Sequence, residues 1–313
     1  MIKLAKGSIN ERISAVGDTI YCGYIVKGSK KNLMIDAGIN LFGPSYISSI
    51  EEILGDRNRL DYLFLTHSHY DHLGAAGYLK RHIRKLSTAS HERVSQLLRK
   101  DSVLEMMNEL SEIQRPFFEH DAGTEDLSIQ PLQIDLFLKE GDDIDLGDLT
   151  CRVYEVPGHT RDCLAYYIPE LEALFPGEAA GVLVGENGNM EPQVVFLSSF
   201  YDYIKSIEKI MALTPKILCI GHKMVLTDGD VMDFLNMSHE ATFGFRKFIE
   251  HQIELADGNL EKVVNNIARK EYDEKGIIFQ ERNAYLVSLK AQVRHILGLM
   301  PTLPTGVTIP LGP

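Results

Sequence analysis

The residues best suited to chemistry gather in one short stretch, residues 66–72. It holds three histidines and one aspartate within six positions: His67, His69, Asp71 and His72. An apolar run, residues 62–65, precedes the stretch, and residues 73–76 follow in a pattern typical of a helix start. Such a strand-to-helix turn lets a rigid sheet aim several side chains at one point. Because neutral imidazoles and carboxylates are ligands of divalent metals, the stretch predicts a metal site.

Four further predicted strands also end near a residue of ligand type, and a glycine lies beside each of these ends or close to it. The residues at these ends are Asp36, His159, Glu178 and His222. Ligands of sheet proteins gather at the carboxyl ends of strands, so we expect all five ends to converge on one pocket. A simpler alternative exists for Asp36, since an aspartate shortly before a glycine is also a common turn former.

The elements around these ends suggest one α/β unit with helical additions. Residues 1–229 contain all the predicted strands, with a largely helical insertion at about residues 90–120. Residues 230–299 read as helices alone, at about 230–256, 260–269 and 281–299. The tail, residues 300–313, holds four prolines and no charge, which excludes a helix there. We expect the helical extension to cover the pocket or to make a homodimer contact, and the tail to be disordered or to lie on a neighbour as an extended arm.

Composition narrows the classes of partner. The net charge of −12, without a concentrated Lys/Arg cluster, argues against a nucleic-acid partner. The chain shows neither a signal peptide nor an apolar run of 18 residues, so we expect no membrane span. Its four cysteines are scattered within apolar runs, which favours buried free thiols and a cytoplasmic location.

Over residues 10–230 the sequence resembles the metallo-β-lactamase-fold hydrolase superfamily. The motif at residues 66–72, followed in order by His159, an acidic residue and His222, carries the resemblance. The helices after His91 and at the C-terminus are similar to its glyoxalase II-like branch, which includes quinolone-signal thioesterases. The resemblance implies an α/β fold, a four-layer αββα sandwich with metals at one edge and a C-terminal α-helical extension.

The resemblance also implies a ligand set for two divalent ions. His67, His69 and His159 would bind the first ion, and Asp71, His72 and His222 the second. The family's bridging residue is an aspartate, and the matching position here is Glu178. Asp36 would support a histidine from behind by a hydrogen bond.

The longer Glu178 side chain moves the bridging carboxylate by roughly 1.5 Å, more than the ~0.5 Å that a preorganised site tolerates. Three outcomes follow from this difference. The loop retreats and keeps the bridge, the spacing or identity of the metals changes, or one metal is lost.

The residue chemistry favours metal-assisted hydrolysis of a small molecule. Two ions, zinc in first place and iron or manganese as alternatives, would lower the pKa of a bridging water towards ~7. Asp71 is the candidate catalytic residue, as an acceptor or relay of a proton. The branch resemblance favours a thioester such as an acyl-CoA, with a lactone or a phosphodiester as alternatives. A regulator that acts by protein contact through a retuned metal site is a rival class, and a di-iron redox protein ranks last.

A thioester substrate needs an apolar pocket floor and cations near its mouth. The apolar candidates are Met106, Met107, Phe117, Phe243 and Phe245, and the cationic candidates are Lys223, Arg246 and Lys247. Each of these residues also has an ordinary role as core or surface.

Overall fold

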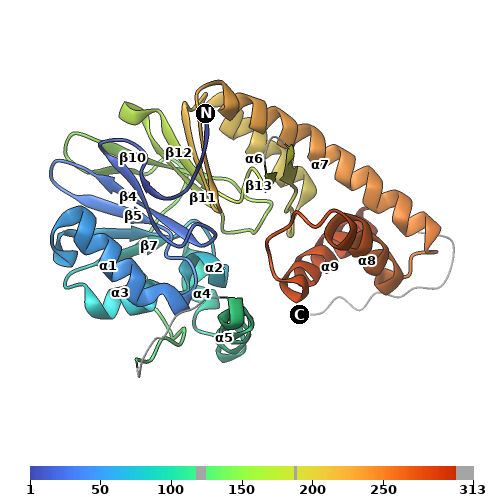
Figure 1. The fold of residues 1–313 in the computed structure, drawn as a ribbon, viewed down its shortest axis with the longest axis horizontal. Helices are drawn as coiled ribbons and strands as arrows, with labels where there is room; N and C mark the ends of the chain where they lie inside the picture. The colour runs from blue at the N-terminus through green and yellow to red at the C-terminus, as the bar shows by residue number, and fades with distance from the viewer. Residues whose placement is uncertain (118–124, 187–188, 301–313) are drawn as a thin grey trace.

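Two β-sheets lie face to face between layers of helices in the computed structural model, which describes residues 1–117, 125–186 and 189–300 (Figure 1). The first sheet has the strand order β2 (Gly7–Ser8), β3 (Ile13–Gly17), β4 (Cys22–Lys27), β5 (Asn32–Ile35), β6 (Tyr62–Phe64), β7 (Ser87–Ser90) and β8 (Leu136–Phe137). The second has the order β1 (Ile2–Leu4), β16 (Met224–Thr227), β15 (Ile217–Ile220), β12 (Ala173–Gly177), β11 (Leu164–Ile168), β10 (Thr150–Glu155) and β9 (Asp143–Asp145). A separate antiparallel hairpin is formed by β13 (Val182–Glu186) and β14 (Asn189–Gln193).

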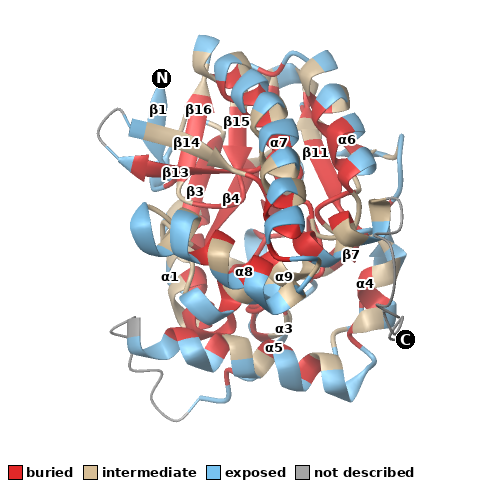
Figure 2. Ribbon diagram, turned by 90° about the vertical axis from the view of Figure 1, so that its right-hand side faces the viewer, coloured by how far each residue is buried: buried red, intermediate tan, exposed pale blue. Residues whose placement is uncertain are grey.

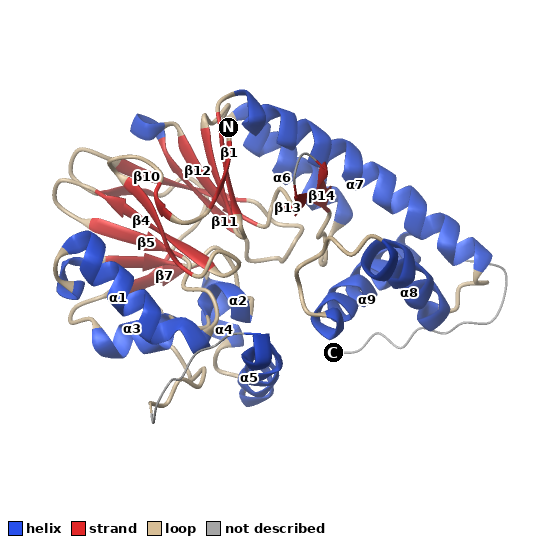
Figure 3. Cartoon of the chain, in the orientation of Figure 1, coloured by secondary structure: helices blue, strands red, loops and turns tan. Residues whose placement is uncertain are grey.

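Helices cover the outer face of each sheet (Figure 3). Those on the first sheet are α1 (Gly43–Leu54), α2 (Tyr70–Leu73), α3 (Ala76–His82), α4 (Glu92–Leu97) and α5 (Asp101–Gln114). Those on the second are α6 (Phe200–Ala212) and the long α7 (Gly229–Leu255). The chain ends in α8 (Leu260–Ala268), a π-helical turn η5 (Arg269–Glu274) and α9 (Arg282–Leu299). Short 3₁₀ turns complete the described elements: Asn40–Phe42, Arg57–Arg59, Arg115–Phe117 and Pro169–Leu171.

Three apolar cores hold these layers together. Buried Phe64, Tyr166 and Phe175 belong to the core between the sheets, where side chains of both inner faces interdigitate. One outer core joins the first sheet to α1 and α3, and the other joins the second sheet to α6, α7 and the C-terminal helices. Helix α7 buries residues spaced three or four apart and leaves its other face in solvent, as Figure 2 shows. The αββα sandwich and its C-terminal helices, predicted from the sequence, are confirmed.

Two buried tyrosines link the sheets beside the strand ends that matter for chemistry. The hydroxyl of Tyr24 on β4 donates to the carbonyl oxygen of Ile220 at 2.7 Å, and that of Tyr166 on β11 donates to Leu65 at 2.7 Å. A buried hydroxyl that finds a partner can stay in an apolar core without a desolvation penalty. These two bonds fix the end of β15 against the first sheet and the end of β6 against the second.

Strand direction brings the predicted ends to one edge. Strands β5 and β6 are parallel neighbours, and so are β12 and β15. Strand β10 runs in the same direction as β12, because β11 is antiparallel to both. Within the first sheet the carboxyl ends of β5 and β6 therefore point the same way, and within the second sheet those of β10, β12 and β15 do.

Some local predictions differ from the structure. Residues 73–76 do not begin a single helix: α2 ends at Leu73 and α3 begins at Ala76, and Gly74 between them is tightly packed, since a Cβ there would lie 2.5 Å from the carbonyl oxygen of Tyr70. Helix α4 begins after His91, whose ring caps it by accepting a hydrogen bond from the amide of Arg93 at 3.0 Å. The tail at 301–313 lies outside the described residues. Among the helices of the described part, none combines the length and the apolarity needed to cross a bilayer.

Candidate metal centre

The five strand ends deliver their side chains to one place. Asp36 follows β5, and the loop after β6 carries His67 and His69 into the first turn of α2, which holds Asp71 and His72. The other three residues, His159, Glu178 and His222, follow β10, β12 and β15. The seven candidate ligands lie in two groups, and within each group one ligand atom per residue is within 4.8 Å of the others. Asp36 lies directly behind them, in contact with His72.

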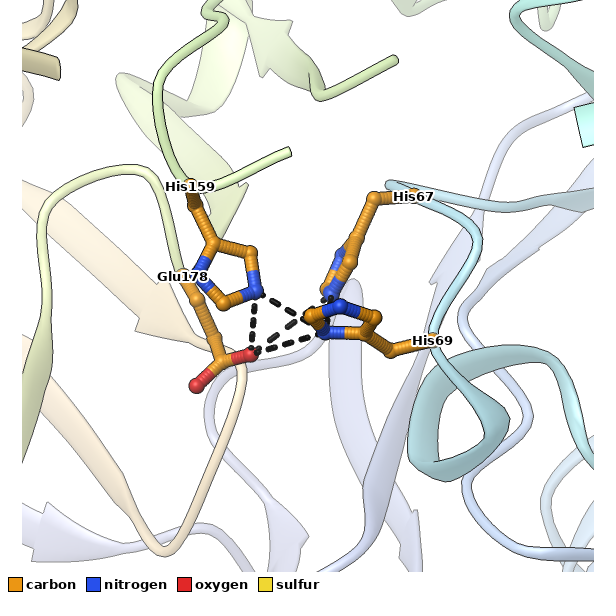
Figure 4. Close-up of side chains that lie close together, drawn as sticks. All are labelled: His67, His69, His159 and Glu178. Carbon is orange, nitrogen blue, oxygen red and sulfur yellow. Dashed lines mark hydrogen bonds and ion pairs between the residues drawn. The ribbon is translucent and has the colours of Figure 1, made fainter. Parts of the chain in front are cut away.

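The first group consists of His67, His69, His159 and Glu178 (Figure 4). The Nδ1 atom of His69 lies 3.1 Å from Nε2 of His67 and 3.0 Å from Nε2 of His159. The Oε2 atom of Glu178 lies 2.9 Å from Nε2 of His159, 3.5 Å from that of His67 and 3.8 Å from Nδ1 of His69. Four donor atoms from three separate loops therefore surround one point.

The second group consists of Asp71, His72 and His222. The Nε2 atoms of His72 and His222 are 3.2 Å apart, and Oδ2 of Asp71 lies 3.7 Å from Nε2 of His222. The rings of His67 and His72 lie next to each other, with centroids 4.2 Å apart, so the two groups adjoin.

Glu178 faces both groups with different oxygens. Its Oε2 atom points to the first group and also lies 3.6 Å from Nε2 of His72. Its Oε1 atom lies 3.7 Å from Nε2 of His222, in the second group. The side chain is 10% exposed, so this carboxylate has left most of its hydration behind and needs cationic partners. A glutamate here thus lies between the groups, as a shared ligand must.

These distances suit metal ions of ordinary size. Zinc bonds to nitrogen and oxygen of 2.0–2.2 Å in a tetrahedron would separate neighbouring ligand atoms by about 3.3–3.6 Å. The observed separations of 2.9 to 3.8 Å in the first group span that value. Two unprotonated ring nitrogens 3.0–3.2 Å apart repel each other because both present lone pairs. A proton or a cation between them removes this repulsion. The donor set therefore fits divalent metal binding.

Four of the five histidines are held from behind through their Nδ1 atoms. That of His159 faces the carbonyl oxygen of Val195 at 2.6 Å, and that of His222 faces the carbonyl oxygen of Ile20 at 2.6 Å. An acceptor at Nδ1 places the proton there and leaves the Nε2 lone pair free for a ligand bond. The other two histidines, His67 and His72, are held through Thr66 and Asp36.

Asp36 is the common support of the two groups. Its Oδ2 atom lies 2.8 Å from Nδ1 of His72 and accepts a hydrogen bond from Oγ1 of Thr66 at 2.8 Å. Oγ1 of Thr66 in turn lies 3.0 Å from Nδ1 of His67. The second oxygen, Oδ1, accepts from the Thr66 amide at 2.8 Å. Asp36 has φ of 59°, an uncommon conformation for a residue with a side chain, and this network holds it there.

Burial and charge divide the protonation states of the cluster. Burial, helped by the neighbouring imidazoles, holds the pKa of His67 well below its usual value, so this ring is neutral and ready to bind a metal. Burial also opposes a charge on His72, but the Asp36 carboxylate outweighs it and raises the pKa of His72 well above normal. A metal that binds His72 must therefore displace a proton.

Close packing at the loops requires small residues. A Cβ at Gly221 would lie 2.8 Å from Cε1 of His72, so a side chain at this position would push on the second group. Gly158 has φ of 131°, and a Cβ there would lie 2.3 Å from the backbone of Tyr203. Glycines beside the strand ends thus let the ligand loops approach each other.

The surroundings of the centre include residues that the sequence did not single out. A small space of about 20 Å³ beside the ligands is lined by Tyr21, Val182, Gln193, Phe279 and Gln280 together with Asp71, Glu178 and His222. Its volume is close to that of one water molecule. The ring of Phe279 lies 5.8 Å from that of His222, so the segment before α9 reaches over the centre. Hairpin β13–β14 was missed, although the Asn-Gly dipeptide at 187–188 is a hairpin signal.

The residues predicted to line a substrate pocket have different positions. Phe245 lines a larger cavity next to the centre, whereas Met107 lies in the core under the first sheet. Met106 and Phe243 are 47% and 42% exposed, and the side chain of Phe117 lies outside the described residues. Among the predicted cations, Lys223 directly follows His222, and its Nζ atom lies 5.8 Å from the centroid of the Phe279 ring and 3.6 Å from Oε1 of Glu186.

Comparison with known proteins shows which proteins this chain is similar to. The sequence profile of the metallo-beta-lactamase superfamily matches residues 16–222. An acyl-coenzyme A thioesterase, MBLAC2 from Gallus gallus, is 30% identical over 199 residues, which cover 62% of this chain and 67% of that protein. A hydroxyacylglutathione hydrolase from Erythrobacter litoralis is 30% identical over 142 residues, which cover 45% and 47% of the two chains. The glyoxalase II-like resemblance predicted from the sequence is confirmed.

A solved structure shares the fold over nearly the whole chain. The metallo-beta-lactamase family protein TTHA1429 from Thermus thermophilus has a TM-score of 0.63 at 17% identity. The likeness covers 92% of this chain and 94% of the other, and so extends well beyond the residues that the sequence profile matches.

Proposed function

Because this chain belongs to the metallo-beta-lactamase superfamily, we propose that it is a metal-dependent hydrolase that cleaves thioesters of the acyl-coenzyme A type. The observation that carries the proposal is the pair of ligand groups that share the Glu178 carboxylate. The similarity to an acyl-coenzyme A thioesterase and to a hydroxyacylglutathione hydrolase supports the substrate class, since both names describe thioester cleavage.

We propose two divalent ions, with zinc favoured and iron or manganese as alternatives. One would be held by His67, His69 and His159, the other by Asp71, His72 and His222, with Glu178 between them. When bound, such ions polarise a carbonyl oxygen and lower the pKa of a bound water to about 7. The two oxygens of Glu178 lie near different histidines of the centre. This supports the first of the three outcomes that the longer side chain allows, in which the loop retreats and the carboxylate still bridges the ions.

The residues around the ions orient the reactants and move protons. Four of the five histidines, all but His69, keep their Nε2 lone pairs directed inwards because their Nδ1 atoms are held from behind. The Asp71 carboxylate lines the small space beside the ligands, where it can accept a proton from the attacking water and pass it on. Phe279 covers His222 and excludes bulk water. Lys223, beside Phe279, is the candidate cation for a phosphate of coenzyme A.

The proposal extends to the setting of the reaction. Four free, buried cysteines, Cys22, Cys151, Cys163 and Cys219, suit a reducing cytoplasm. A small-molecule substrate, no membrane or nucleic-acid partner, and a homodimer through the helical extension at 230–299 or the tail remain predictions.

The test is hydrolysis by zinc-loaded protein of butyryl-CoA, a homoserine lactone and bis(p-nitrophenyl) phosphate, with His69→Ala beside the wild type. We expect kcat/KM for the thioester to exceed that for the other two substrates by at least about 100-fold, and the variant to lose about 100-fold or more. Preference for the phosphodiester or the lactone would assign the centre to another hydrolase class. If His69→Ala were as active as the wild type, the metal centre would have no part in the reaction.

A further inference from the structure

The hairpin β13–β14 forms a floor that continues from the metal centre into a larger cavity. Val182 and Gln193 are cross-strand partners that line the small space beside the ligands. Two residues further along each strand, Val184 and Glu191 are also partners and line the larger cavity. Because side chains two apart in a strand point to the same side, these four residues share one face of the hairpin. Gln193 lines both spaces, so the two adjoin.

The larger cavity has a volume of about 270 Å³ and mostly apolar walls. Its apolar lining comes from the hairpin, α7, the segment before α9 and α9 itself: Val184, Val194, Phe245, Phe248, Ile278 and Tyr285. The volume is nearly twice the ~150 Å³ of an apolar cavity that accepts benzene. By that proportion it has room for an alkyl chain of about eight to ten carbons.

The charged groups at this cavity are already paired with one another. The ammonium of Lys275 lies 2.6 Å from Oε1 of Glu191 and 2.7 Å from Oε2 of Glu271. The Gln292 amide donates to the carbonyl oxygen of Val194 at 2.9 Å. The occupant of the cavity therefore gains from burying apolar surface and not from a charge on the ligand.

We propose that this cavity binds the acyl chain of the substrate, with the thioester carbonyl beside the ligand groups and the chain passing Gln193. The inference rests on the proposed thioesterase function and narrows it to medium-chain acyl groups. A chain of up to about ten carbons fits inside, and longer chains gain nothing further from the cavity.

Position 244 offers a way to fill the cavity without disturbing the fold. Gly244 lies inside α7 and lines the cavity, and a Cβ there would meet no atom within 4 Å among the described residues. Ala241, one helical turn earlier, lines the same wall. Gly298 in α9 is a matched control, because its Cβ would likewise meet nothing among those residues and it does not line the cavity.

The experiment measures binding of two non-hydrolysable thioethers, S-butyl-CoA and S-decyl-CoA, to zinc-loaded protein by calorimetry. Each buried methylene improves affinity by about fourfold, so even partial burial of six methylenes gives a decyl preference of at least about tenfold. We expect this preference in the wild type and in Gly298→Leu. It should fall below about threefold in Gly244→Leu and in Ala241→Leu, each checked for helicity and zinc content.

A second series separates the two proposals. In the wild type, kcat/KM should rise from butyryl-CoA to decanoyl-CoA and then level off. Chain-dependent thioether binding without hydrolysis of any thioester would refute the proposed function and leave the cavity assignment standing. Hydrolysis of butyryl-CoA without a preference for longer chains would support the proposed function and refute the cavity assignment. Equal affinities of the two thioethers, no binding of either, or an unchanged preference in both cavity variants would overturn the cavity assignment.

Discussion

Replacing Asp36 with asparagine should weaken both metal sites without removing a ligand. In the wild type, Oδ2 of Asp36 faces two donors, Oγ1 of Thr66 and Nδ1 of His72, each at 2.8 Å. If the asparagine NH₂ group took the place of Oδ2, its own N–H donors would point at the donors of Thr66 and His72, and no hydrogen bond could form. The alternative is an amide oxygen there, which leaves the NH₂ group against the Thr66 amide, whose bond to Oδ1 is 2.8 Å. Either orientation leaves at least one buried donor unpaired.

The size of the effect follows from how each histidine is held. His72 contacts Asp36 directly, whereas His67 is reached only through Thr66. Loss of such support typically weakens metal binding by about 10- to 100-fold, which is about 1.4–2.8 kcal/mol. We expect the second ion, at His72, to weaken by about 100-fold. The first ion, at His67, should weaken by about tenfold.

The assay is competition for zinc between the folded variant and a chromophoric chelator, fitted to two sites. Asp135→Asn is a matched control in the same sheet. Its Oδ2 atom accepts from the amide of Thr88 at 2.8 Å and from Oγ1 of Thr88 at 3.0 Å and pairs with Lys80, whereas Asp36 takes the Thr66 amide on Oδ1 and the hydroxyl on Oδ2 and contacts His72. Zinc affinities within about threefold of the wild type in Asp36→Asn would refute the role of this network. So would an equal loss in the Asp135→Asn control.

Three further predictions concern the same centre. Glu178→Asp should bind its second ion at least about tenfold more weakly, because a carboxylate shorter by roughly 1.5 Å cannot face both groups within a ~0.5 Å tolerance. Metal analysis after gel filtration would detect the loss, and full retention of two ions would contradict the bridge. Gly221→Ala should lower zinc content, since its Cβ would lie 2.8 Å from Cε1 of His72; Gly229→Ala, whose Cβ meets no described atom within 4 Å, is the control. Zinc affinity should rise from pH 6 to pH 8, because the pKa of His72 is raised and its proton must leave on binding; titrations that release no proton at pH 7 would refute this.

The sequence alone predicted a metal site and the strands that deliver its candidate ligands. Apolar runs of strand length and ligand-type residues at their ends are local features, visible without any contact between distant parts of the chain. The order of the residues from the 66–72 stretch to His222 was specific enough to predict the sandwich, which is confirmed. Helix ends were predicted only to within about a residue: the helices expected at about 230–256 and 281–299 are Gly229–Leu255 and Arg282–Leu299, because helix ends depend on local capping geometry.

The tertiary structure decided what surrounds and supports the candidate ligands. The bonds from His159 to Val195, from His222 to Ile20 and from His72 to Asp36 join residues 36, 202 and 36 positions apart. No local pattern encodes such pairs, because they exist only once both sheets have packed. The same holds for Phe279 over His222 and for the hairpin floor leading away from the centre. Whether a glutamate at position 178 can face both groups depends on where the loop after β12 ends, and packing of the two sheets fixes that position.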